Sequence, residues 1–210
     1  MSSREWKDRG FCRNDVTSLF ATNQEVNIEN KERILRLSKP IVRIGANNSC
    51  KESRKIRADK FYGLKNLLFL AVGAKVVLEY NLCPELGLSN GCTGIVKEIV
   101  YGETVAERPP ALPKYCWVYI DEYVGDSFFP PENEERKKWV PIYPVTAEEY
   151  TSSDKTLSRT MLPLRLAWAW TIWKSQGQTI RTKIILNLGE KEKNMACLML
   201  HSQELLSCQI

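Results

Sequence analysis

The sequence lacks a long hydrophobic run. Its longest apolar stretch, residues 67–74, is far shorter than the ~20 consecutive apolar residues that a membrane-spanning helix needs. The first ten residues carry charged side chains where a secretory signal peptide has an apolar stretch. Both absences predict a soluble intracellular chain with no membrane partner.

Histidine and paired cysteines are scarce as well. The seven cysteines follow no regular spacing, no CxxC pair occurs, and His201 is the single histidine. A structural zinc site needs four such ligands at characteristic spacings, so we expect no structural metal. Without a secretory signal the thiols are expected to be reduced, and to pack as small apolar side chains in or near a core. The cysteines are Cys12, Cys50, Cys83, Cys92, Cys116, Cys197 and Cys208.

What is present is the composition of a globular protein. Of 210 residues, 43% are apolar and 26% are charged, which excludes collagen, a coiled coil and wholesale disorder. The length suits one large domain or two small ones.

Positive charge is concentrated in one window. Residues 31–65 contain eleven Lys or Arg against three acidic residues, so the window carries +8 while the whole chain carries +5. Such a segment either binds phosphates or forms a solvated linker that its own repulsion keeps open. Composition favours neither.

The first half of the chain predicts a strand followed by a helix. Val16, Leu19 and Phe20 indicate the strand, and residues 25–37 have apolar side chains at moderately helical spacing. Thr22 and Asn23 are suitable caps for that helix.

Residues 75–146 predict a small all-β barrel. Short strands are expected within the apolar stretch 67–82, around Val96, Ile99 and Val100, and over 115–124 and 137–145, separated by Gly, Pro and acidic loops. The dipeptide Asn90-Gly91 indicates a hairpin, and Gly73 a bend just before the first strand.

A last unit begins near Thr160. Leu162, Leu164 and Leu166 alternate as they would at a strand edge, and residues 167–177 predict a short helix ended by Gly177. A buried strand is expected over 182–189. The fold class is therefore α/β, with an inserted β module.

The segment LPLRLAWAWTIWKSQGQT (162–179) carries the polar cluster that points to function. Hydroxyls, a cation and an amide gather at one helix end, which suits a phosphate backbone on one side and a nucleotide sensor on the other. Spacing alone favours a plainer interpretation, a helix end capped by polar residues. The cluster consists of Thr171, Lys174, Ser175, Gln176 and Gly177.

This segment resembles motif V of the superfamily 1 DNA helicases, and its leading LPLRLAWA is typical of the PIF-type (petite integration frequency) helicases. LFATNQEVNIEN (19–30) resembles motif IV of those enzymes. Residues 72–99, VGAKVVLEYNLCPELGLSNGCTGIVKEI, resemble the beginning of their inserted Src-homology-three-like barrel. The resemblance covers roughly residues 16–194, with weak stretches at 45–62 and 124–138.

The resemblance implies an incomplete RecA-like unit, the second such domain of a P-loop NTPase, with an inserted small all-β barrel. The expected parts are a polar lead-in (1–15), the first part of the RecA-like domain with a basic linker (16–74), the barrel (75–146), the rest of the RecA-like domain with motif V (147–194), and an aberrant tail (195–210).

It also implies site residues and partners. Thr22, Asn23, Thr171 and Lys174 are expected to contact the backbone of single-stranded DNA, along which the family moves in the 5′-to-3′ direction. Ser175 is expected to bind the nucleic acid as well. Gln176 and Gly177 are expected to couple that strand to the nucleotide.

The tryptophans of this segment are expected to differ in role. Trp173 stands where the family usually has His; it can stack on a base, a contact worth about 1–3 kcal/mol, but cannot exchange protons as imidazole does. Trp168 and Trp170 are expected in the core.

The ATP site is missing from the sequence. No GxxxxGK[ST] phosphate-binding loop occurs. The acidic partner that would hold Mg²⁺ is missing too, because the acidic run at residues 121–126 falls inside the predicted barrel. In the family both elements lie on the first RecA-like domain, after which this chain is expected to begin. ATP and Mg²⁺ are therefore expected in the full-length enzyme, and no cofactor for this chain alone. The resemblance implies the nucleus, with the mitochondrion as the alternative.

The tail departs from the family, which continues with a segment like SYVALSRV. Codons permitted for residues 195–210, read from the third base of the Met195 codon, give GLSYVALSRVTKLSD. This compatibility predicts a frameshift or a mispredicted exon boundary near Asn194. The alternative is a natural helix with Leu198, Leu200 and Leu205 turned inward.

Three functional interpretations stay open. The first is a fragment of an ATP-dependent PIF-type helicase acting in genome maintenance. The second is a non-enzymatic module that binds single-stranded nucleic acid through the basic window and Trp173. The third is a translated relic of a mobile-element helicase, without a stable fold.

Overall fold

The computed structural model describes residues 16–103, 110–150, 156–176, 180 and 183–187. The chain divides into two compact units, which are described separately. One comprises residues 1–33 and 167–210, and the other residues 34–166. No helix of the described part is long and apolar enough to cross a membrane.

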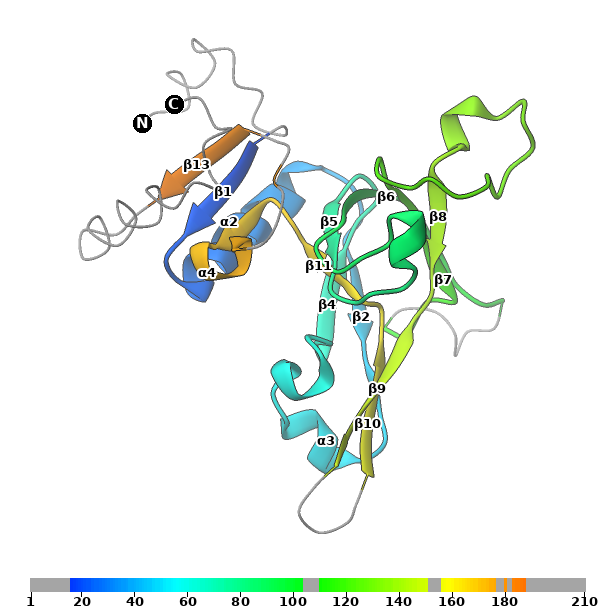
Figure 1. Cartoon of the computed structure of the whole chain (residues 1–210). Coiled ribbons are helices and arrows are strands. Elements are labelled where there is room, and N and C mark those ends of the chain that lie inside the picture. The colour runs from blue at the N-terminus through cyan, green and yellow to red at the C-terminus, as the bar shows by residue number, and fades with distance from the viewer. Residues whose placement is uncertain (1–15, 104–109, 151–155, 177–179, 181–182, 188–210) are drawn as a thin grey trace. The chain divides into compact units, whose positions relative to one another are not determined.

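The first unit is built on a parallel three-stranded sheet. Its strands lie in the order β12 (Ala169–Thr171), β1 (Val16–Phe20) and β13 (Lys183–Asn187), with β1 between the other two (Figure 1). All but the last residue of β1 are buried. The predicted strands over 16–20 and 182–189 are confirmed, the second over 183–187, but the burial expected of the second strand is wrong, because none of its residues is buried.

Helix α2 (Asn23–Arg36) follows β1, as the sequence predicts, and begins two residues earlier than expected. Val26 and Ile34 are buried, whereas Ile28 and Leu35 are more than half exposed. The apolar face is therefore narrower than the sequence pattern indicates.

The predicted helix over 167–177 is largely wrong. Residues 169–171 form β12, which pairs in parallel with β1, and the helix α4 spans only Ile172–Ser175. All three residues of β12 are buried, and a short apolar run does not distinguish a buried strand from a helix. The expected core positions of Trp168 and Trp170 are confirmed, because both side chains are buried.

The second unit consists mainly of antiparallel strands. A five-stranded sheet has the order β11-β5-β6-β7-β8, a second sheet the order β3-β10-β9, and β2 pairs with β4. The strands are β2 (Val42–Gly45), β3 (Asn47–Asn48), β4 (Leu67–Leu70), β5 (Lys75–Leu78), β6 (Thr93–Val100), β7 (Tyr115–Tyr119), β8 (Trp139–Ile142), β9 (Val145–Tyr150), β10 (Thr156–Met161) and β11 (Leu164–Leu166). Short helices are α3 (Lys51–Lys55), η2 (Ala58–Phe61), η3 (Pro84–Leu86) and η5 (Glu134–Arg136).

The strands expected within 75–146 are confirmed as β5, β6, β7 and β8, and the bend at Gly73 is confirmed by its φ of 88°. The hairpin at Asn90-Gly91 is only a turn. Cys92 N–H donates to the Ser89 carbonyl at 3.0 Å and Gly91 has a φ of 96°. Residues 79–92 lie between β5 and β6, so the turn does not join them directly.

The basic window is folded rather than an open linker. Within residues 31–65 the chain forms the end of α2, then β2, β3, α3 and η2. Ile44, Phe61 and Leu64 from this window are almost completely buried. These apolar anchors overcome the repulsion among the cations, which the composition alone did not reveal.

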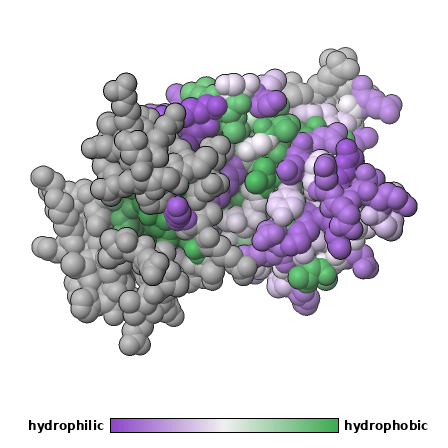
Figure 2. Space-filling model, turned by 90° about the horizontal axis from the view of Figure 1, so that it is seen from above, coloured by the Kyte–Doolittle hydropathy of each residue, from purple (hydrophilic) through white to green (hydrophobic). Residues whose placement is uncertain are grey.

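The β7–β8 connection has the opposite charge character. Residues 121–138 include six acidic and three basic side chains. On the face that Figure 2 shows, hydrophilic residues gather mainly on the right-hand side, with isolated hydrophobic ones among them.

Two cysteines are core residues, as expected for free cysteines that pack as small apolar side chains. Cys92 and Cys116 are buried, whereas Cys50 and Cys83 are partly exposed. Burial raises the pKa of Cys116 to about 12, so its thiol stays protonated at neutral pH and is a poor nucleophile.

We expect iodoacetamide at pH 8 to label Cys50 and Cys83 in the native protein and to spare Cys116, as peptide mass mapping will show. Equal labelling of all three would contradict this burial.

Candidate nucleic-acid interface

The carboxyl ends of two adjacent parallel strands bring the predicted site residues together. Phe20, the last residue of β1, is in register with Thr171, the last residue of β12. Thr22 and Asn23 follow the first strand, and α4 follows the second. Ligands of open α/β sheets bind at this edge, outside the carboxyl ends of the strands.

Thr22 begins α2 through a reciprocal cap. The Glu25 amide donates to the Thr22 hydroxyl at 3.3 Å, while the Thr22 amide and hydroxyl donate to the Glu25 carboxylate at 3.2 and 2.6 Å. The predicted cap at Thr22 is therefore confirmed, whereas Asn23 is the first helical residue. Both residues are exposed, but the Thr22 hydroxyl is engaged by Glu25.

Thr171 begins α4 in a similar way. Its hydroxyl accepts a hydrogen bond from the Lys174 amide at 3.3 Å, and its side chain is buried. The Ser175 hydroxyl donates to the Ile172 carbonyl at 2.7 Å. Two of the predicted DNA contacts, Thr171 and Ser175, thus also fix the backbone of this turn.

Three side chains of this segment point to solvent. Trp173 is 55% exposed, and Lys174 and Gln176 are exposed. An exposed indole beside an ammonium group provides a stacking face and a positive charge, the two elements that single-strand sites combine. Gly177 lies outside the described residues.

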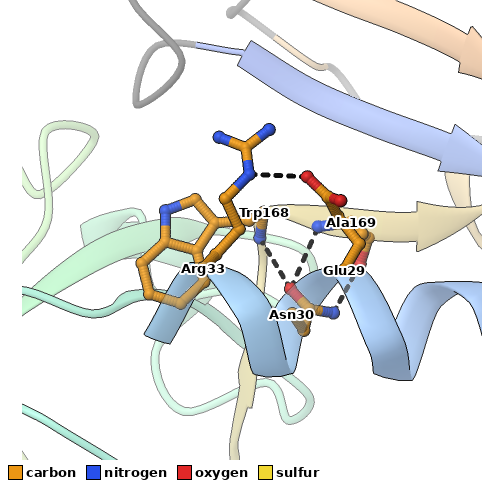
Figure 3. A network of polar contacts seen from close by, with 5 residues as sticks. All are labelled: Glu29, Asn30, Arg33, Trp168 and Ala169. Atoms are coloured by element: carbon orange, nitrogen blue, oxygen red, sulfur yellow. Dashed lines mark hydrogen bonds and ion pairs between the residues drawn. The ribbon is translucent and has the colours of Figure 1, made fainter. Parts of the chain in front are cut away.

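The residue that holds this edge together was not predicted from the sequence. Asn30 is buried on α2, where its side-chain oxygen accepts the amides of Trp168 and Ala169, each at 3.1 Å. Its amide group donates to the Ala169 carbonyl at 3.0 Å. Figure 3 shows the Asn30 side chain directed at this stretch of backbone. Asn30 therefore fixes the start of β12, the strand that leads to Thr171.

A signal for Asn30 exists in the sequence. It lies between Val26 and Ile34 at intervals of four residues, on the buried face of the helix, and a polar residue in such an apolar row needs buried partners. One turn away, Arg33 forms an ion pair with Glu29 at 2.6 Å, and the Arg33 side chain is 3% exposed.

The described part of this edge gathers polar and aromatic side chains. It offers a cation, an exposed indole, hydroxyl groups and an amide. No group of three or more His, Cys, Asp or Glu side chains suited to a metal ion occurs among the described residues of the chain.

Comparisons with known proteins identify one group of relatives, although no family model matches the chain. The ATP-dependent DNA helicase PIF6 of Trypanosoma brucei brucei is 29% identical over 180 residues, 85% of this chain and 20% of the relative. Human ATP-dependent DNA helicase PIF1 is 31% identical over 165 residues, 79% of this chain and 22% of the relative. Campylobacter jejuni Pif1 is 26% identical and covers 90% of this chain, which spans 40% of it.

Solved structures agree on the fold. Pif1 helicase from Candida albicans has a TM-score of 0.60 at 22% identity, covering 85% of this chain and 42% of its own. Bacteroides Pif1 bound to single-stranded DNA has a TM-score of 0.54 at 22% identity, and the match covers 81% of this chain and 34% of the Bacteroides chain. The fold therefore matches RecA-like helicase domains, as predicted.

The resemblance to PIF-type helicases is confirmed: the homologues that match most of this chain are PIF1-type enzymes. The chain spans about a fifth of the length of the Trypanosoma and human relatives.

Proposed function

We propose that this chain, homologous to PIF1-type helicases over most of its length, is a segment of an ATP-dependent DNA helicase acting 5′ to 3′ in genome maintenance, in the nucleus. The observation that carries this proposal is that the segments resembling motifs IV and V end their strands side by side at one sheet edge, with Phe20 in register with Thr171, 151 residues later in the sequence. Such an edge suits a DNA strand that crosses both.

Within this proposal the exposed residues have separate roles. Lys174 contacts a phosphate, Trp173 stacks on a base, and Asn23 hydrogen-bonds the DNA backbone. Thr22, Thr171 and Ser175 use their hydroxyls to shape the two turns and so present backbone amides to the strand. Gln176 and Gly177 couple the strand to the nucleotide.

The antiparallel strands within 75–146 correspond, in this proposal, to the inserted barrel, and the flanking segments 16–74 and 147–194 to the second RecA-like domain. ATP and Mg²⁺ are held by the first RecA-like domain of the full-length enzyme. This chain has no GxxxxGK[ST] loop, so alone it binds DNA without hydrolysing ATP.

The direct test is equilibrium binding of the 210-residue chain to a fluorescent oligo(dT), followed by anisotropy over a salt series. We expect the binding constant to fall with salt: a plot of its logarithm against the logarithm of the salt concentration should have a slope of about −0.7 for each phosphate contacted. We expect no ATP hydrolysis. No binding at low salt, together with a cooperative melt, would refute the proposal. No binding with a broad, uncooperative melt would identify the chain as a relic.

Trp173 provides a second test at the level of one side chain. Replacing Trp173 with Ala removes a stacking face worth about 1–3 kcal/mol, so we expect the Kd for oligo(dT) to rise by about 5- to 150-fold. Trp173→Phe keeps an aromatic face and is expected to retain most of the affinity. Because the indole is 55% exposed, neither variant should change the melting temperature by more than a few degrees. Equal affinity of all three proteins would remove Trp173 from the interface.

A further inference from the structure

A second cationic surface lies in the other unit of the chain. Residues 51–60, KESRKIRADK, carry five basic and two acidic side chains, and all five cations are exposed. We name this surface the basic knob and define it by Lys51, Arg54, Lys55, Arg57 and Lys60.

The knob is held in one conformation by a buried arginine. Arg159 of β10 is completely buried, and it donates to the carbonyl oxygens of Ser53 at 2.6 Å and Ile56 at 2.9 Å. It also donates to the Leu64 carbonyl at 2.9 Å. Figure 1 shows α3 beside the β9–β10 hairpin that carries this arginine. The cations therefore project from a fixed backbone.

Most of the charge on the knob is uncompensated. Lys51, Arg54 and Lys55 form no ion pair with any described residue of the chain. Arg57 pairs with Asp59 at 3.4 Å, but both side chains are mostly exposed, so the pair is weak. Lys60 pairs with Glu149 at 3.2 Å.

The knob offers charge without stacking faces. None of residues 51–60 is aromatic; the nearby Tyr62 is 64% exposed, and its ring packs edge-on against Tyr80, with ring centroids 6.2 Å apart. Single-strand sites combine basic grooves with stacking rings, whereas double-stranded DNA presents one phosphate charge per ~1.7 Å of its axis to cations alone.

From this we infer that the basic knob binds the phosphate backbone of duplex DNA, at a site separate from the Trp173 edge. Lys51, Arg54 and Lys55 lie three and four residues apart on α3, so they share one side of the helix and contact neighbouring phosphates. The inference rests on the proposed function in one respect: a chain that contacts the unwound strand also meets the duplex that supplies it.

The test is a triple charge reversal, Lys51→Glu with Arg54→Glu and Lys55→Glu, assayed with a blunt 20-base-pair duplex of mixed sequence. We expect duplex affinity at 100 mM salt to fall more than tenfold, and the logarithmic salt slope to become shallower by about 2–3, since each lost phosphate contact removes about 0.9. The matched control is Lys137→Glu, an exposed lysine of the acidic β7–β8 connection, which is expected to change duplex affinity less than twofold.

Three results would overturn the inference. These are an unchanged duplex Kd in the triple variant, an equal loss with Lys137→Glu, and an equal loss of oligo(dT) binding, which would mark a general phosphate surface. The milder triple Gln variant, compared by circular dichroism, ensures that any loss is not caused by misfolding. The proposed function is tested separately, by the effect of Trp173→Ala on the Kd for oligo(dT). Loss of the duplex site in the triple variant is not expected to change that Kd.

Discussion

Replacing Arg159 with Leu is expected to abolish cooperative folding of the unit formed by residues 34–166. The guanidinium makes four hydrogen bonds, to Asn48 at 3.1 Å and to the three carbonyls of Ser53, Ile56 and Leu64. It also lies 4.3 Å from the centre of the Phe61 ring. Leucine fills part of the volume but removes all four donors, and of the four acceptors the Ser53 carbonyl keeps a hydrogen bond from the Ile56 amide at 3.3 Å.

The expected loss is comparable with the stability of the whole unit. A hydrogen bond that involves a charged group contributes about 1.5–3 kcal/mol, so the loss of four is expected to cost about 6 kcal/mol or more against a typical total of about 5–15 kcal/mol. Burial lowers the pKa of Arg159, which reflects the cost of desolvating a cation that no described carboxylate neutralises. The carbonyl dipoles outweigh that cost only while all of them are engaged.

Thermal unfolding followed by circular dichroism tests this expectation. Arg159→Lys keeps the charge but cannot reach the same set of carbonyls, so it is expected to melt cooperatively at a lower temperature than the wild type, whereas Arg159→Leu is expected to show no cooperative transition for this unit. Arg43→Leu, at an exposed position of β2, serves as the matched control and is expected to change stability by less than about 0.5 kcal/mol. A cooperative Arg159→Leu melt within a few degrees of the wild type would show that Arg159 does not hold this unit together.

Arg159 also shows why the sequence did not reveal everything about the second unit. Within residues 156–161 it reads as a polar residue in a strand, and nothing local distinguishes it from an outward-facing arginine. Its partners lie about 95 to 111 residues away in the chain. Pairings of such separation depend on the tertiary arrangement, so composition left the neighbouring basic window undecided between a linker and a binding surface.

The first unit was more predictable where local patterns suffice. The strand at Val16, the cap at Thr22 and the helix that follows depend on neighbouring residues, and they were found. The sequence did not predict the strand β12. Its residues Ala169, Trp170 and Thr171 are all buried, so the segment lacks the alternation of apolar and polar side chains that would distinguish a strand from a helix. The site residues of motif V came from the resemblance rather than from spacing, and their roles stay predictions.

Replacing Asn30 with Leu is expected to loosen the first unit at the start of β12. Leucine is close to asparagine in size, but it leaves the Trp168 and Ala169 amides and the Ala169 carbonyl without their buried partner. At about 1–3 kcal/mol for each unpartnered group, the expected loss is about 3 kcal/mol or more. Because Thr171 is only two residues further along the strand, the loosening should reach the proposed DNA site.

Hydrogen exchange locates this effect. The amides of Trp168 and Ala169 should exchange at least about tenfold faster in Asn30→Leu, since about 1.4 kcal/mol corresponds to a factor of ten, and the Kd for oligo(dT) should rise with them. Asn27→Leu, at an exposed position one turn earlier on α2, is the matched control and should leave both quantities unchanged. Faster exchange without weaker DNA binding would mean that Asn30 stabilises the sheet alone. Unchanged exchange at both amides would mean that the Asn30 side chain does not hold β12, and the positioning role would be lost.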